Sequence, residues 1–134
     1  MAGLELDTAE QWLYQTLTAN ATIAAAGVYN AVAGGTTTRY VVFQFQGGSR
    51  YKVIGNVDVW SDLVYLIKVV DKSTTYNTSK PLRAAITSAL DGASGTTVDG
   101  VVFACIREAP IRYVEVSNGV EYRHSGDLWR IYAR

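Results

Sequence analysis

Reactive and metal-binding side chains are scarce in this 134-residue sequence, which has one cysteine, Cys105, one histidine, His124, and one methionine. A disulfide within the chain needs two cysteines, and a structural zinc site needs about four Cys or His ligands, so both are excluded. The acidic residues form no spaced set of the calcium-loop type. We therefore expect no metal ion and no cofactor.

Long apolar runs and an excess of one charge are also missing. The longest apolar runs, residues 63–67 and 101–106, are far shorter than the roughly 20 residues that span a bilayer. The N-terminal segment carries acids where a signal peptide needs basic residues, which predicts a protein of the cytoplasm with no membrane partner. Twelve Lys and Arg balance twelve Asp and Glu, giving a net charge of +0. This balance argues against a strongly basic nucleic-acid binder.

What the chain does have is enough apolar material for one core. Hydrophobic residues make up 49% of the sequence, and its length fits a single domain spanning residues 1–134. Nine tyrosines and three tryptophans suit both β-strands and the centres of protein interfaces. We expect core positions for Trp12 and Trp60, and interface positions for Tyr51, Tyr76 and Tyr113, which lie near predicted loops.

Apolar residues at helical spacing predict two helices. One covers residues 9–18, behind a capping box at Asp7 or Thr8. The other begins near Pro81, carries an apolar stripe from Leu82 to Leu90 and ends at Gly92. Between them, a short helical turn over residues 23–26 is expected, capped by Thr22 and stopped by Gly27.

Alternation of apolar and polar residues predicts the strands, at residues 40–46, 53–60, 63–71, 101–109, 111–116, 120–124 and 127–133. Gly47 is expected to end the first, and Pro110 to interrupt or bend the fourth. For residues 63–71 a helix capped by Ser61 or Asp62 is the alternative. Asn118-Gly119 predicts a type I′ hairpin turn. The pattern indicates an α+β fold, a mostly antiparallel sheet flanked by two α-helices.

No set of residues predicts catalysis. Across the hairpin, His124 stands opposite Tyr113, which is typical of a structural histidine. Cys105 lies in an apolar segment, which is typical of a buried thiol. Gly34-Gly35 and Gly47-Gly48 lack the Gly-Lys-Ser/Thr ending of a phosphate-binding loop. We therefore expect a protein that is not an enzyme and has no catalytic residues.

Several segments in order resemble one known family. They are residues 20–30 (NATIAAAGVYN), 39–45 (RYVVFQF), 56–61 (NVDVWS), 82–92, which end in ALDG, and 122–131 (YRHSGDLWRI). This order resembles the tail terminator, or tail completion, proteins of tailed bacteriophages. The resemblance implies an α+β subunit that forms a ring, expected to be a hexamer. This ring caps the tail tube and joins it to the head connector. DNA would pass through the ring without sequence-specific binding.

The resemblance also implies partners and a place. The partners are copies of the same chain, the tail tube protein and the head-connector or head-closure proteins, and the place is the head-tail junction of the virion after assembly in the host cytoplasm. Residues 34–38, 47–52 and 72–79 are expected to make these contacts. The candidate contact residues are Thr36, Thr37, Arg39, Arg50, Tyr51, Lys52, Lys72, Thr74 and Tyr76.

One segment departs from the family pattern. In the family the strand ending in Val-Trp is followed soon by a helix, whereas residues 63–79 intervene in this chain, as a hairpin extension or an arm toward a neighbouring subunit. Two other functions remain open. One is a different neck component, such as a head-closure or connector adaptor. The other is a small ligand-binding or enzymatic domain, for which His124 and the scattered acids are the only candidates.

Overall fold

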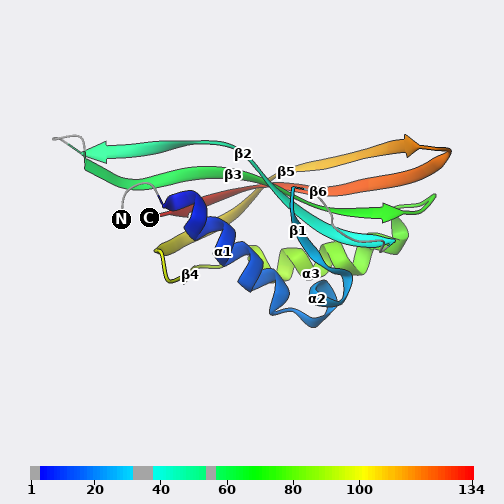
Figure 1. Ribbon diagram of the computed structural model, residues 1–134, viewed down its shortest axis with the longest axis horizontal. Helices are drawn as coiled ribbons and strands as arrows, with labels where there is room; N and C mark the ends of the chain where they lie inside the picture. Colours follow the sequence, from blue (N-terminus) through cyan, green and yellow to red (C-terminus); the bar gives the residue numbers. More distant parts are fainter. Residues whose placement is uncertain (1–3, 32–37, 54–56) are drawn as a thin grey trace.

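The computed structural model describes residues 4–31, 38–53 and 57–134, and its centre is one six-stranded sheet (Figure 1). The strand order is β1-β2-β3-β6-β5-β4. Only β1 and β2 pair in parallel, and the other neighbours pair antiparallel. The sheet is therefore mixed, and two long hairpins, β2–β3 and β5–β6, supply most of it.

The elements follow one another in the order helix, short strand, hairpin, helix, short strand, hairpin. Their bounds are α1 Glu5–Thr18, α2 Ala21–Ala26, β1 Val28–Asn30, β2 Arg39–Val53, β3 Val57–Lys72, the 3₁₀ turn η1 Asn77–Ser79, α3 Lys80–Leu90, β4 Gly95–Thr96, β5 Val101–Ser117 and β6 Val120–Ala133.

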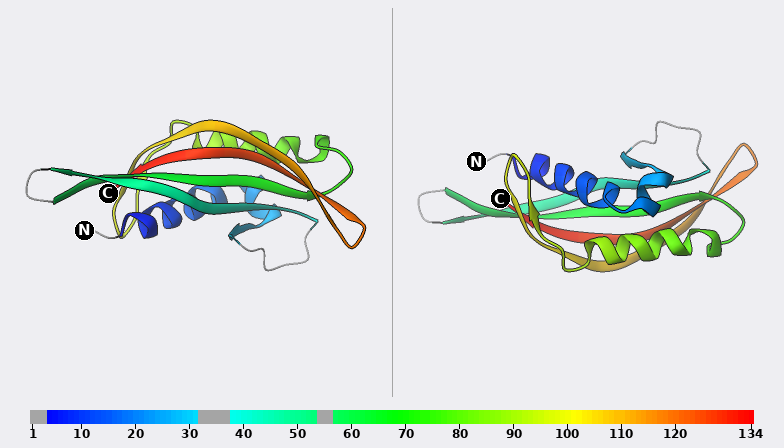
Figure 2. Two further views of the ribbon diagram at one scale, coloured as in Figure 1. Left: turned by 90° about the horizontal axis from the view of Figure 1, so that it is seen from above. Right: turned by 90° about the horizontal axis from the view of Figure 1, so that it is seen from below.

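All three α-helices lie against the same face of the sheet (Figure 2). The core forms between them, where Leu13 and Leu17 of α1 and Ile86 of α3 meet the fully buried Tyr65 and Trp129 of the central strands. Two predicted features need correction here. The described helices number three rather than two, and they cover one face instead of flanking the sheet.

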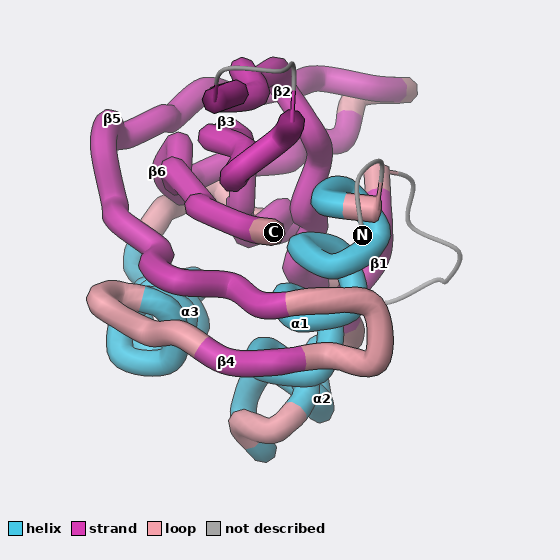
Figure 3. Tube along the Cα trace, turned by 90° about the vertical axis from the view of Figure 1, so that its left-hand side faces the viewer, coloured by secondary structure: helices cyan, strands magenta, loops and turns pink. Residues whose placement is uncertain are grey.

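The opposite face of the sheet is shielded by curvature. Strands twist by about 20° or more relative to their neighbours, and the sheet bends along its width so that β5 and β2 rise around β6 and β3 (Figure 3). Val42, Leu66 and Val70 point to this concave face, yet they are buried. The curl thus gives the sheet a second, smaller apolar layer without any helix over it.

The strands run further than the sequence predicts. Gly47 does not end β2, because the strand passes it at a bulge between Phe45 and Gly47 and continues to Val53. The expected strand over residues 53–60 is confirmed in part, since Val53 ends β2 and residues 57–60 begin β3, while residues 54–56 lie outside the described residues. Likewise β6 runs without a break through Gly126. A glycine that interrupts a pattern in sequence can sit inside a strand when the neighbouring chain approaches closely.

Residues 63–71 form a strand, as predicted, and belong to β3. This strand pairs with β2 on one side and with β6 on the other. Of the two expected forms, a hairpin extension or an arm, residues 63–72 adopt the hairpin, with β2, and lie inside the sheet instead of forming an arm. A segment with apolar residues on both of its faces is typical of a central strand.

The hairpin at Asn118-Gly119 is confirmed. Asn118 and Gly119 have φ angles of 52° and 75°, the left-handed values that a type I′ turn needs at both positions. The turn fixes the register of β5 on β6, and Tyr113 pairs with His124 as expected. Pro110 does not interrupt the strand as expected, because β5 continues through it to Ser117.

The helix ends differ in part from those predicted. Helix α1 begins at Glu5, with no side-chain cap, so the capping box at Asp7 or Thr8 is wrong. Helix α2 is capped by Asn20, whose Oδ1 accepts hydrogen bonds from the amides of Thr22 and Ile23 at 3.0 and 3.3 Å. Helix α3 spans the predicted stripe, with Leu82, Ile86 and Leu90 buried.

Candidate functional site

The predicted contact residues lie at opposite ends of the β2–β3 hairpin. Arg39 begins β2, and Lys72 ends the antiparallel β3 beside it. Tyr51 lies near the other end of β2, on the order of 40 Å away at the rise of an extended strand. The members of the first group are Arg39, Lys72, Thr74 and Tyr76, and those of the second are Arg50, Tyr51 and Lys52. Thr36 and Thr37 fall outside the described residues.

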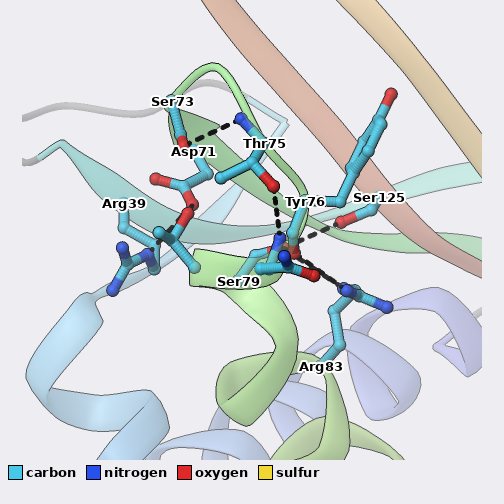
Figure 4. Close-up of polar contacts among 10 residues, drawn as sticks. Arg39, Asp71, Ser73, Thr75, Tyr76, Ser79, Arg83 and Ser125 are labelled. Carbon is cyan, nitrogen blue, oxygen red and sulfur yellow. Dashed lines mark hydrogen bonds and ion pairs between the residues drawn. The ribbon is translucent and has the colours of Figure 1, made fainter.

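A buried carboxylate organises the first group. Asp71, with 1% of its surface exposed, lies 3.3 Å from Nε of Arg39, its partner in the β2–β3 register. Figure 4 shows Asp71 beside Arg39, and the hydroxyl of Thr78 donates a hydrogen bond to the same carboxylate. A buried charge is tolerated when it is paired and hydrogen-bonded in this way. Asp71 therefore ties the start of β2 to the segment that leads into α3.

The segment between β3 and α3 is held in shape by its own polar side chains. Ser73 Oγ accepts a hydrogen bond from the amide of Thr75 at 3.2 Å, and Thr75 Oγ1 accepts one from the amide of Asn77 at 3.2 Å. Nη2 of Arg83 donates to the carbonyl of Tyr76 at 3.0 Å (Figure 4). Such local hydrogen bonds replace the missing strand ladder. This predicted contact segment is consequently an ordered surface.

The ring of Tyr76 lies among arginines from the neighbouring hairpin. The guanidinium of Arg112 stands 4.3 Å from the ring centroid and that of Arg123 stands 5.2 Å from it. Cation–π contacts of this kind contribute about 0.5–1 kcal/mol at exposed sites. Tyr76 thus links the β3–α3 segment to the β5–β6 hairpin.

We expect Asp71→Ala to lower the free energy of unfolding by about 2 kcal/mol, because it leaves the Thr78 hydroxyl and the Arg39 guanidinium without their acceptor. Urea unfolding followed by circular dichroism measures the change. Thr74→Ala, an exposed position in the same segment, is the control and should shift stability by less than about 0.5 kcal/mol. Equal losses in the two variants would contradict the role given to Asp71.

The second group divides between the two faces of the sheet, with Tyr51 beside Trp60 on the concave face and Arg50 and Lys52 on the side of α1. The rings of Tyr51 and Trp60 lie 5.3 Å apart, and the Tyr51 hydroxyl donates to Asp62 at 3.4 Å. Arg50 is exposed and reaches Glu5 at 3.8 Å, while Lys52 is exposed near the end of β2. Trp60 is 40% exposed. The predicted core position of Trp60 is therefore wrong, whereas that of Trp12, which is 4% exposed, is confirmed.

Two long strand edges are the surfaces that sequence reasoning missed. Strand β1 covers β2 only from Val41 to Phe43, and β4 covers β5 only at Val101 and Val102. Within the described residues, no further strand pairs with the outer edges of β2 or β5. An unpaired edge presents backbone donors and acceptors to another chain. The strand order that creates these edges cannot be read from the local patterns.

The candidate histidine belongs to a structural cluster on the concave face. Nε2 of His124 lies 2.8 Å from Oε1 of Glu115, and its ring stacks on Tyr113 with centroids 4.3 Å apart. Nζ of Lys68 donates to the Tyr113 hydroxyl at 2.7 Å. Burial lowers the pKa of His124, against the opposing effect of Glu115. These contacts orient the ring, and its burial disfavours the charged form.

The remaining candidates for chemistry are buried or dispersed. Cys105 is completely buried, and burial raises the pKa of its thiol to about 12, so the reactive thiolate is not formed near neutral pH. In the described part of the chain, no three His, Cys, Asp or Glu residues come together as metal ligands. Nor does any helix there combine the length and apolar content needed to cross a bilayer.

Comparison with known proteins gives a structural neighbour. No protein-family model matches the sequence, and no curated protein does. Among solved structures, the chain is similar to a chain of the "Virion of native gene transfer agent (GTA) particle", with a TM-score of 0.67 and 22% sequence identity over 90% of each chain. At this identity the likeness establishes a shared fold along nearly the whole length.

Proposed function

We propose that this protein is a structural subunit of a phage-like virion, in which it forms a ring, a hexamer, that terminates the tail tube and joins it to the head connector. The observation that carries the proposal is the pair of unpaired edges on opposite sides of one sheet, β2 and β5. Its support from known structures is the similarity to a chain of a gene transfer agent virion.

Two different edges favour a ring over a symmetric dimer. If the β2 edge of one copy pairs with the β5 edge of the next copy, every copy uses both of its edges in a heterologous contact. Such contacts close into a ring when the rotation per subunit divides the circle. The β2–β3 and β5–β6 hairpins project toward opposite ends of the molecule (Figure 1), which gives each copy one end for the tail tube protein and another for the head-connector proteins.

The proposal assigns no catalytic step to the chain. Its function is geometric: the ring stops polymerisation of the tube and leaves an axial channel for DNA. With a net charge of +0, the subunit offers DNA no overall attraction, which suits passage without sequence-specific binding. The ordered segment over residues 72–79 and the exposed residues 50–52 are the proposed points of contact with neighbouring virion proteins.

Blocking the β5 edge tests the proposal. Val114 and Val116 are exposed near the end of that edge, and lysines on an edge strand discourage pairing with another strand. We expect the double variant Val114→Lys/Val116→Lys to lose ring assembly on purified tail tubes, measured by negative-stain electron microscopy and by mass in solution. Val98→Lys, at a position that is 88% exposed and outside the strands, is the matched control and should assemble normally.

The location of the rings decides between neck components. Rings seated on the free end of the tail tube are the expected result. Rings found on the head side of the neck would instead identify a head-closure or connector adaptor. A wild-type protein that stays monomeric at high concentration and leaves tube ends bare would overturn the ring itself.

A further inference from the structure

A groove between α3 and the β5–β6 hairpin gathers basic side chains from two elements. It has a volume of about 380 Å³ and lies on the helix-covered side of the sheet. Lys80 and Arg83 line it from α3, and Arg107 and Arg112 line it from β5. Asp127 of β6 is the one carboxylate among the described lining residues. The groove therefore carries a net charge of about +3 in a chain whose total is +0.

Local geometry explains why the four cations meet. Lys80 and Arg83 are three residues apart in α3, so they share one side of the helix. On β5, the register shifts between Arg107 and Ala109, and the extra residue of a bulge re-aims the side chains beyond it. Because of this shift, Arg112 faces α3 together with Arg107, although their odd–even spacing would place them on opposite faces of a regular strand.

The four groove cations lie close together, and no carboxylate of the described residues forms an ion pair with any of them. Among the described residues, Arg39, Arg50, Arg123 and Arg130 each form an ion pair with an acid. No ion pair joins any of the four groove cations to a described acid. Arg83 donates instead to neutral acceptors, Ser79 Oγ at 3.2 Å and the Tyr76 carbonyl at 3.0 Å.

The cations that line the groove repel one another. Burial and the neighbouring charge of Arg112 lower the pKa of Arg83. At the groove wall, burial raises the pKa of Asp127, although Arg107 and Arg83 act in the opposite direction. Bringing like charges together costs free energy that a bound anion can offset. The groove thus has the charge and the concave shape of an anion-binding site.

We propose that this groove binds the carboxylates of an acidic segment of a partner protein. Arginine pairs with carboxylates through two parallel hydrogen bonds, which gives geometric specificity. Asp127 repels any anion, but a peptide also brings backbone N–H groups that can donate to its carboxylate, whereas a phosphodiester has no donor. This difference favours a protein partner over DNA.

The test compares two anionic probes on the full chain. A labelled octaglutamate peptide and a labelled 12-base-pair DNA duplex are titrated with the protein at low salt, and fluorescence anisotropy reports binding. We expect the double variant Lys80→Gln/Arg107→Gln to bind the peptide about tenfold more weakly than the wild type. Both residues are exposed, so the fold should be unchanged, as circular dichroism will verify.

The matched control lowers the net charge by the same two units elsewhere. Arg134→Glu does so at an exposed position outside the groove and should leave peptide affinity within about twofold of wild type. Equal losses in the groove variant and the control would overturn the proposal, because general charge would then explain binding. So would a duplex that binds more tightly than the peptide and loses affinity in the groove variant.

A second copy of the chain is the other possible occupant. If the groove variant changes the mass of the protein in solution without any probe, the carboxylates come from the chain itself and the proposal of a separate partner is overturned. The inference stands apart from the proposed ring. Ring assembly that persists in a variant unable to bind the peptide would leave both proposals intact.

Discussion

Trp129→Ala is expected to lower the free energy of unfolding by about 3–5 kcal/mol, as large aromatic-to-alanine changes in cores do. Trp129 is fully buried on the central strand β6, where α1, α3 and the sheet meet. Its loss would remove the largest fully buried side chain among the described residues and leave a cavity that the surrounding β-sheet cannot close. Urea unfolding followed by far-UV circular dichroism measures the change without using tryptophan fluorescence.

Trp60→Ala is the matched control for Trp129→Ala. Trp60 is 40% exposed, and its main contact is the ring of Tyr51. We expect a loss of about 1 kcal/mol or less, mostly from that aromatic pair. Similar losses at the two positions would contradict the assignment of the helix-covered face as the core of the protein.

The two tryptophans illustrate what sequence reasoning can and cannot supply. Both lie in alternating apolar segments, and alternation states which residues share a face but not which face the helices cover. That choice depends on strand order, which is set by pairing between distant segments. The stripe of α3 and the Asn118-Gly119 turn were predictable because each is fixed by residues only a few positions apart.

The candidate surfaces divide in the same way. The segment over residues 72–79 was predictable as a polar interruption, and its order follows from hydrogen bonds within it. The pairing of Arg39 with Asp71 was not, because it follows from the register of β2 on β3. The basic groove depends on a bulge in β5 and on the packing of α3 beside it. Neither the bulge in β5 nor the packing of α3 beside it can be predicted from a local sequence pattern.

The positive and negative charges balance in number but are distributed unevenly over the fold. A net charge of +0 describes a molecule in which several arginines form ion pairs while four other cations lie together in one groove. The overall composition does not show this uneven distribution. For an assembly subunit, partner choice depends on such local differences, since complementary patches steer and align the partners.

Gly126→Ala is expected to cost about 3 kcal/mol, near the upper end for inserting a methyl group into a packed interior. A Cβ at Gly126 would collide with the carbonyl oxygen of Ile67 and the Cα of Lys68. These atoms belong to the backbone of β3, which β2 and β6 hold on both sides. The backbone cannot move aside without separating two central strands.

The glycine also makes room for a side chain. Lys68 is paired with Gly126 across β3 and β6, and its Cβ lies 2.9 Å from the position that a Cβ of residue 126 would take. From there Lys68 reaches across to the hydroxyl of Tyr113 on β5. Gly126→Ala should therefore lower stability and also break the contact between Lys68 and Tyr113.

Ser125→Ala is the control for this last prediction. It changes the neighbouring residue of the same strand, adds no atom and removes a hydroxyl whose contact with Ser79 Oγ is a long 3.4 Å. We expect a loss of about 1 kcal/mol or less. Thermal unfolding of both variants measures the difference. A Gly126→Ala protein as stable as the wild type would show that β3 and β6 lie further apart at this point than the close approach of Ile67 and Gly126 requires.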